Sequence, residues 1–304
     1  MKSNLLLTML AGSIFTLVTS LPASADTARE IMAKVNKIAR ESYSSTYQKR
    51  EFNTCARFSK KDKKIVCKKG NTRKIVLESF HKAQEVGSEE EEMHSIFIPE
   101  KGPHPKAAGM LLREYADPHK DAYFMICLSK KNFGSRRRCP NEKGPRFFGT
   151  EFALEDMEAS KTEHYTYRIL KETEYRKRPV WIIESLPTLK RARKIKYGKS
   201  MIWVDKERYI KIKVQLWNRQ GKRYKQIDMA DIKRIDNVWV SGKIRALNVR
   251  ERRFTIMRLI SVTFNIEISD AIFDTRILTH EDERSPAERG YIDSVLSPHR
   301  KRIR

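Results

Sequence analysis

Residues 209–217 read YIKIKVQLW, and this short stretch indicates the class of fold that the chain adopts. Apolar and polar side chains alternate along it, with Ile210, Ile212, Val214 and Leu216 on one parity and Lys211, Lys213 and Gln215 on the other. A period of two is typical of a β-strand with one face on a core and the other in water. The stretch therefore predicts a half-buried strand whose apolar row lies on a single face.

A longer stretch, residues 254–268, repeats this pattern with one interruption. Its apolar residues again share one parity: Phe254, Ile256, Ile260, Val262, Phe264, Ile266 and Ile268. Arg258 interrupts the row, so either a charge lies on the apolar face or a β-bulge intervenes.

The remaining pattern predicts an antiparallel, mainly β protein. A hairpin is expected over residues 57–67, turning near Lys61 and Asp62, with further strands at 74–80, 94–98, 110–115, 122–128, 165–170, 180–185, 200–204, 223–229 and 238–247. Many strands separated by turns favour one antiparallel sheet or an open barrel. An amphipathic helix is expected over residues 27–42 and a helical turn over 152–157. Helices do not alternate with strands, which excludes a parallel α/β architecture.

Composition and the first residues predict an exported, strongly basic protein. The chain of 304 residues has 63 Lys and Arg against 38 Asp and Glu, a net charge of +25, and 39% hydrophobic residues, which excludes a disordered chain. Lys2, an apolar run at 5–21 and the small residues Ala23, Ser24 and Ala25 are typical of a secretory signal peptide cleaved after Ala25.

The cysteines favour disulfides. Cys55, Cys67, Cys127 and Cys139 form an even set, and the oxidising compartment of an exported protein promotes their pairing. Two local intervals of equal length make 55–67 and 127–139 the simplest of the three connectivities. The spacings do not match a zinc site.

No pattern of catalytic or cofactor-binding residues is found. The sequence lacks an H-E-x-x-H helix, a G-x-S-x-G elbow and a P-loop. Adjacent acids at Glu155 and Asp156 are expected to cap a helix start rather than to form an acid/base couple. We expect no enzyme, no catalytic residue, no metal site and no cofactor.

Several blocks, in a consistent order, resemble the outer-membrane lipoprotein-sorting proteins of the LolA/LolB-like superfamily. They are PKAAGMLL at 105–112, DAYFM at 121–125, FGTEF at 148–152 with EDM at 155–157, PVWIIE at 179–184, WVDK at 203–206, DIKRID at 231–236 and DAIF at 270–273. The resemblance implies a strongly curved, incompletely closed antiparallel sheet, a half-barrel, with helices packed in its concave face. It further implies a single domain over 26–280. From Glu281 the strand pattern fails, so residues 281–304 are expected to form a basic, solvated C-terminal tail.

The resemblance also implies a function. Such proteins carry lipids or lipidated proteins through the periplasm, and relatives of this subgroup accompany RND-type exporters. We therefore expect a periplasmic carrier that binds a lipid or a lipoprotein acyl group in an apolar cavity and sorts it to the outer membrane. An inner-membrane RND- or MMPL-type transporter and an outer-membrane acceptor are the expected partners. The alternative is a non-carrier accessory or assembly module of an envelope exporter that uses its basic surface.

Two sets of residues are candidates for these roles. Candidate cavity-lining residues come from the apolar rows and one aromatic: Ile210, Ile212, Val214, Leu216, Phe254, Ile256, Ile260, Val262 and Trp203. A loop at 190–199 carries the candidate contacts to anionic head groups at a membrane surface: Arg191, Arg193, Lys194 and Lys196. The same surplus of charge fits an acidic partner, a polyanion or a merely solubilising surface, although nucleic acid is not an expected partner.

Overall fold

The fold is described here from a computed structural model. The structure describes residues 27–61, 64–84, 92–99, 109–114, 122–128, 136–138, 146–157, 161–193, 195–278, 290 and 293–297. Its α-helices are α1 (Ala28–Glu41), α2 (Leu154–Met157) and α3 (Leu189–Ala192). Its 3-10 helices are η1 (Phe147–Gly149), η2 (Thr162–His164), η3 (Asp270–Phe273) and η4 (Thr275–Leu278).

Strands make up most of the described chain. The first eight are β1 (Ser45–Cys55), β2 (Phe58–Lys61), β3 (Lys64–Cys67), β4 (Thr72–Gln84), β5 (Glu92–Pro99), β6 (Gly109–Glu114), β7 (Ala122–Leu128) and β8 (Arg136–Arg138). The others are β9 (Tyr165–Glu174), β10 (Pro179–Pro187), β11 (Tyr197–Asp205), β12 (Ile210–Asn218), β13 (Arg223–Ile235), β14 (Val238–Asn248) and β15 (Arg253–Phe264). The predicted strands are confirmed, although β15 ends at Phe264, before the predicted end at 268, and Asp62 and Tyr115 lie outside the described residues. Strands β1 and β8 were not predicted.

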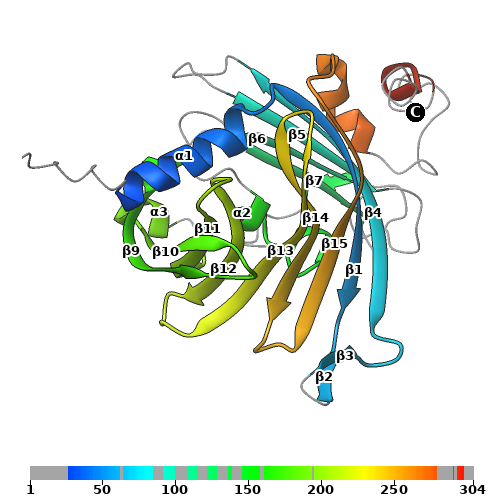
Figure 1. Ribbon diagram of the computed structural model, residues 1–304. Coiled ribbons are helices and arrows are strands. Elements are labelled where there is room, and N and C mark those ends of the chain that lie inside the picture. Colours follow the sequence, from blue (N-terminus) through cyan, green and yellow to red (C-terminus); the bar gives the residue numbers. More distant parts are fainter. Residues whose placement is uncertain are drawn as a thin grey trace, which may run out of the picture.

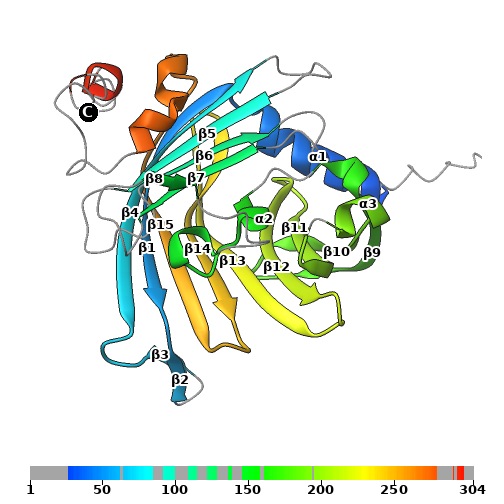
Figure 2. The ribbon, with the colours of Figure 1, turned by 180° about the vertical axis from the view of Figure 1, so that it is seen from behind.

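One strongly curved antiparallel sheet organises the molecule. Among the described residues it has 13 strands in the order β8-β7-β6-β5-β4-β1-β15-β14-β13-β12-β11-β10-β9, and β2 and β3 form a separate hairpin. The two ends of this order, β8 and β9, do not pair with each other, so the sheet stays open. Figure 1 shows the sheet bent into a half-barrel with α1 across its mouth and α2 inside the curve, and Figure 2 shows the same arrangement from behind. The predicted fold class is confirmed.

Helix α1 covers the part of the inner face formed by β9 to β12. Thr27 and Glu30 form a capping box at its start, each side chain bonding the backbone N–H of the other residue. Its apolar stripe, Ile31, Met32 and Val35, packs on a buried cluster that includes residues of β10 and β11. The periodicity of residues 27–42 therefore predicted both the helix and its buried face.

The outer face of β4, β5 and β6 is covered by the segment that follows β15. Ile272, Ile277 and Leu278 pack on a fully buried core with Phe80 and Ile96. This segment is the orange stretch on the outside of the sheet in Figure 1. The outer face of this part of the sheet is thus shielded from water by a filled core.

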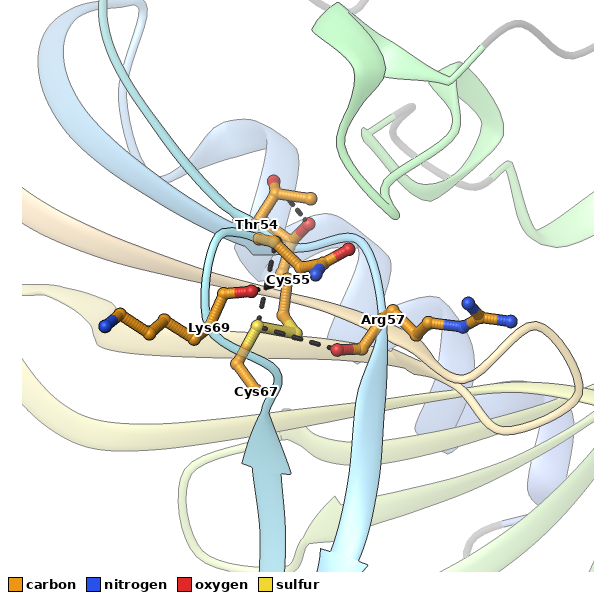
Figure 3. Close-up of a disulfide and its surroundings, with 7 residues drawn as sticks. Thr54, Cys55, Arg57, Cys67 and Lys69 are labelled. Carbon is orange, nitrogen blue, oxygen red and sulfur yellow. Dashed lines mark hydrogen bonds between the residues drawn. A yellow bond between two sulfur atoms is a disulfide. The ribbon is translucent and has the colours of Figure 1, made fainter.

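A disulfide joins Cys55, at the end of β1, to Cys67, at the end of β3 (Figure 3). It closes the predicted hairpin of β2 and β3 at its base, and Cys55 packs there with Phe58 and Leu247. This predicted pairing is confirmed. The second predicted pair involves Cys139, which lies outside the described residues.

Candidate functional site

Two cavities lie on the inner face of the sheet. Cavity A has a volume of about 170 Å³ and lies among α1, α2 and strands β9 to β15, with Met32, Ile202 and Ile227 among its apolar walls. Cavity B has a volume of about 280 Å³ and lies over β1, β4, β5 and β6. Asp156, Ile244 and Met257 line both cavities, so the two adjoin.

A β-bulge in β12 decides which predicted residues reach cavity A. Trp203 pairs with Lys213 and Val204 pairs with Lys211, so Ile212 is an extra residue in its strand. An extra residue reverses the alternation of side chains beyond it. Val214 and Leu216 consequently line cavity A.

The other predicted residues of this region lie elsewhere. Ile212 and Trp203 are buried in a separate cluster with Val180, against which Ile210 packs. The prediction that the apolar row of 209–217 shares one face was therefore wrong, and the bulge is the physical reason. Lys211, predicted to be on the polar face, lines cavity A instead.

A second bulge divides the row of β15 in the same way. Lys49 of β1 pairs with Ser261 and Arg50 pairs with Leu259, so Ile260 is the extra residue. Ile260 is 53% exposed. The bulge that the interruption at Arg258 suggested is present, two residues further along the chain.

The predicted residues of β15 consequently lie on two faces. Met257 lines both cavities and therefore lies on the inner face of β15. Side chains alternate along a strand, so Phe254 and Ile256, which are three and one positions before Met257, lie on the opposite face. Phe254 packs outside against Phe58. Beyond the bulge, Val262 packs with Phe264 in a cluster near the mouth of the sheet that also holds Tyr43 of the segment after α1. The candidates of β15 therefore do not converge on one cavity.

The FGTEF block folds into a segment seated on the inner face of the sheet. Phe147 and Phe152 are buried against Phe52 of β1, and the backbone N–H of Glu151 donates to Thr255 of β15 over 2.9 Å. Gly149 has a φ of +71°, a conformation that favours glycine. The motif is therefore structural: it brings α2 and its acids onto the cavity wall.

A buried ion pair fixes α2 to the sheet. The Nζ of Lys225 on β13 lies 2.6 Å from a carboxylate oxygen of Asp156, and the two side chains are 3% and 1% exposed. Tyr197 of β11 donates its hydroxyl to Asp156 over 2.8 Å and accepts from Lys225 over 2.6 Å. Burial, and then the charge of Asp156, raises the pKa of Tyr197 well above its ordinary value. Asp156 also accepts the N–H of Ala153, which confirms the predicted capping role.

Lys211 of β12 also lies on the wall of cavity A, and its side chain is only partly exposed. Burial alone lowers the pKa of its ammonium group to about 8. No carboxylate ion-pairs with Lys211 in the part of the chain that the structure describes. The cavity therefore holds a cation that is easily neutralised.

The basic loop at 190–199 is partly helical. Arg191 lies in α3 and its Nε donates to the hydroxyl of Tyr165 over 3.2 Å, and the backbone N–H of Lys196 donates to Glu155. Arg193 and Lys196 are exposed, whereas Lys194 lies outside the described residues. The structure therefore gives Arg193 and Lys196 a surface position without showing what they bind.

Cavity B has a polar floor that the sequence did not indicate. Arg50 of β1 donates from Nε to Gln48 over 2.8 Å. His81 of β4 shares hydrogen bonds with the hydroxyls of Ser95, at 2.8 Å, and Ser79, at 3.1 Å. Burial, and then the charge of Arg50, lowers the pKa of His81 to about 4, so its imidazole is neutral at pH 7. Gln48, Arg50 and Phe52 are spaced two residues apart, and this spacing is the sequence signal that could have indicated a strand with polar residues on its inner face.

The described residues contain neither a group suited to hold a metal ion nor a helix suited to span a membrane. No group of three or more His, Cys, Asp or Glu side chains in them is arranged to hold a metal ion. Within the same residues, the helices are too short or too polar to cross a membrane.

Comparison with known proteins identifies the class of fold. A domain from Vibrio parahaemolyticus described as an outer membrane lipoprotein-sorting protein is 20% identical, with a TM-score of 0.65 over 83% of this chain and 97% of that chain. A DUF1329 family protein from Desulfovibrio piger is 15% identical, with a TM-score of 0.67 over 83% and 98%. A LolA superfamily protein from Nitrosomonas europaea is 15% identical, with a TM-score of 0.58 over 82% and 98%. The protein therefore has a LolA-like fold.

The family follows from the sequence. A family model described as "Uncharacterized protein" matches residues 106–280, more than half of the chain, so the chain belongs to that family. A search of curated proteins finds no match.

Proposed function

We propose that the protein is a periplasmic carrier that binds a lipid, or the acyl chains of a lipoprotein, in cavities A and B and delivers it toward the outer membrane. The observation that carries the proposal is the pair of adjoining, largely apolar cavities on the inner face of an open LolA-like sheet. No chemical step is required, and the proposal is a non-enzymatic binding function.

The physical need for such cavities follows from the cargo. An acyl chain that leaves a bilayer loses about 0.8 kcal/mol for each exposed CH₂. A carrier must therefore offer a dry, apolar site, and small-molecule sites typically enclose roughly 300–1,000 Å³. The two cavities, at about 170 and 280 Å³, together reach that range.

The proposal includes the organisation of the chain and its partners. Residues 1–25 would be a signal peptide cleaved after Ala25, residues 26–280 the LolA-like domain and residues 281–304 a basic tail; residues 1–26 lie outside the described residues. The proposed donor is an inner-membrane RND- or MMPL-type transporter, and the acceptor lies in the outer membrane. The resemblance of the sequence blocks to the superfamily supports these partners.

The test is native mass spectrometry with lipid analysis on protein purified gently from the periplasm of its own host. Val214→Phe adds a ring to the wall of cavity A, where unfilled space limits the cost of overpacking. Ile260→Phe is the matched control, because the same kind of side chain is added at a position that is 53% exposed. We expect bound lipid in the native protein and in Ile260→Phe, and at least a tenfold lower occupancy in Val214→Phe.

The rival function predicts a different result. A non-carrier assembly module would be purified without lipid, would refuse added lipids, and would crosslink stably to an envelope protein in intact cells. Reproducibly empty protein that also takes up no added lipid would refute the carrier.

A further inference from the structure

Arg50 is a cation on the wall of cavity B, and no acid among the described residues compensates its charge. Its Nε donates to Gln48, and its Nη1 lies 3.5 Å from the carbonyl oxygen of Ser241, at the limit of a hydrogen bond. No carboxylate forms an ion pair with it among residues that the structure describes. Burial lowers the pKa of Arg50 to about 10, and the guanidinium is still charged at pH 7. Arg50 is partly buried, and a partly buried charge with no ionic partner among the described residues offers a site for an anion.

The other ionisable groups on this cavity do not neutralise Arg50. Asp156 is already paired with Lys225 at 2.6 Å. Glu114 lies on the same wall and has an interaction of its own. Tyr43, which faces Arg50, has a raised pKa because of burial, so its hydroxyl is neutral. Within the part of the chain that the structure describes, the charge of Arg50 on this cavity is therefore uncompensated.

Neutral hydrogen-bonding groups lie on the strands next to Arg50. Ser79 and His81 of β4, and Ser95 of β5, line the same cavity and form one connected set. Serine hydroxyls rotate to donate to an incoming acceptor, and a charged donor with neutral hydroxyls beside it suits an oxyanion. Apolar walls complete the cavity on the inner side, with Phe52, Leu77 and Met110 among them.

We infer that Arg50, together with the Ser79–His81–Ser95 set, binds the anionic head group, a carboxylate or a phosphate, of an acyl lipid whose chain lies on the apolar walls of the cavities. This inference rests on the proposed carrier function and specifies the chemical class of its cargo. Charge recognition at Arg50 makes the carrier selective for acidic over neutral amphiphiles of equal chain length.

The test compares head groups at constant chain length. Palmitate, lysophosphatidic acid with a palmitoyl chain and the uncharged alcohol hexadecanol are titrated into the full-length mature protein and binding is followed by isothermal calorimetry. Arg50→Gln removes the charge and keeps a hydrogen-bonding side chain. Arg258→Gln, at an exposed arginine of β15 that pairs weakly with Glu51 at 3.7 Å, is the control. Circular dichroism verifies that each variant is folded.

The native protein is expected to bind at least one acid about tenfold or more tightly than hexadecanol. Arg50→Gln should lose that preference by at least tenfold, because hydrogen bonds to charged groups are the stronger class. Its affinity for hexadecanol and all affinities of Arg258→Gln should be unchanged. The acid that carries the preference, carboxylate or phosphate, identifies the head group.

Two results would overturn the inference, and they differ in meaning. Equal affinity of the native protein for acids and alcohol, or an equal loss for all three ligands in Arg50→Gln, refutes the head-group site and leaves the carrier intact. Absence of binding for every ligand refutes the carrier function and the inference with it. If Arg50→Gln does not fold, Ser79→Ala with Ser95→Ala replaces it, and unchanged preference in that variant refutes the hydroxyl set.

Discussion

Replacement of Lys225 by methionine should destabilise the protein far more than an ordinary surface substitution. The change removes the cation from a pair whose side chains are 3% and 1% exposed, and it leaves the carboxylate of Asp156 with the hydroxyl of Tyr197 and the N–H of Ala153 as partners. Loss of one member of a buried pair costs about 3–5 kcal/mol, because the other charge stays buried without compensation. Methionine retains most of the apolar stem of lysine, so the loss arises mainly from the charge.

A double-variant cycle separates the charge from the packing. Asp156→Asn in the background of Lys225→Met removes the uncompensated charge and retains an amide oxygen for Ala153. The double variant should therefore be more stable than Lys225→Met alone. Urea unfolding, followed by circular dichroism and intrinsic fluorescence, measures each free energy. A loss below about 1 kcal/mol for Lys225→Met would refute the reasoning, since an exposed pair contributes no more than that.

Two further predictions concern titration and the disulfide. Lys211→Met should raise the stability of the protein at pH 7 and flatten its dependence on pH. The pKa of Lys211 is about 8 in the folded protein against an ordinary 10.5, so the unfolded chain binds more protons between these values and native stability rises with pH there. Thermal unfolding across pH 7–10.5 tests this, and parallel curves for the two proteins would contradict it. Cys55→Ser with Cys67→Ser should lower stability by about 3 kcal/mol, because the short loop that the disulfide closes is lost. Lipid binding should be unchanged, because neither residue lines cavity A or cavity B. A large loss of binding in folded protein would contradict the separation of hairpin and site.

The sequence predicted most of the fold because its signals are local. The stripe Ile31, Met32 and Val35 has helical spacing, and the predicted helix over 27–42 is α1. Alternation predicted the strands of the sheet in the same way. The exceptions are β8, which has only three residues, and β1, a central strand whose inner row mixes Gln48 and Arg50 with Phe52, so that neither face is uniformly apolar. A strand whose polar residues face a cavity lacks the period that reveals other strands.

The site was predicted only in part because its geometry depends on bulges. Val214 and Leu216 reach cavity A, whereas Ile210 and Ile212 do not, although all four share one parity. A bulge depends on how two strands pair. The interruption at Arg258 suggested the bulge in β15, whereas the even alternation of 209–217 gave no sign of the bulge in β12. The approach of Arg50 to His81 also results from pairing, between β1 and β4, and is equally invisible to periodicity.

The bulges and the helix together explain why the inner face is not filled. Helix α1 makes its main strand contacts with β9 and β12, so its 14 residues cover one side of the curve and leave the inner face of β1, β4 and β5 to cavity B. The bulge in β12 turns Lys211, rather than another apolar residue, toward cavity A. A protein selected only for stability would have filled these positions with close-packed apolar side chains. Arg50 on the wall of cavity B and Lys211 on the wall of cavity A are therefore consistent with the inferred occupant that carries a negative charge.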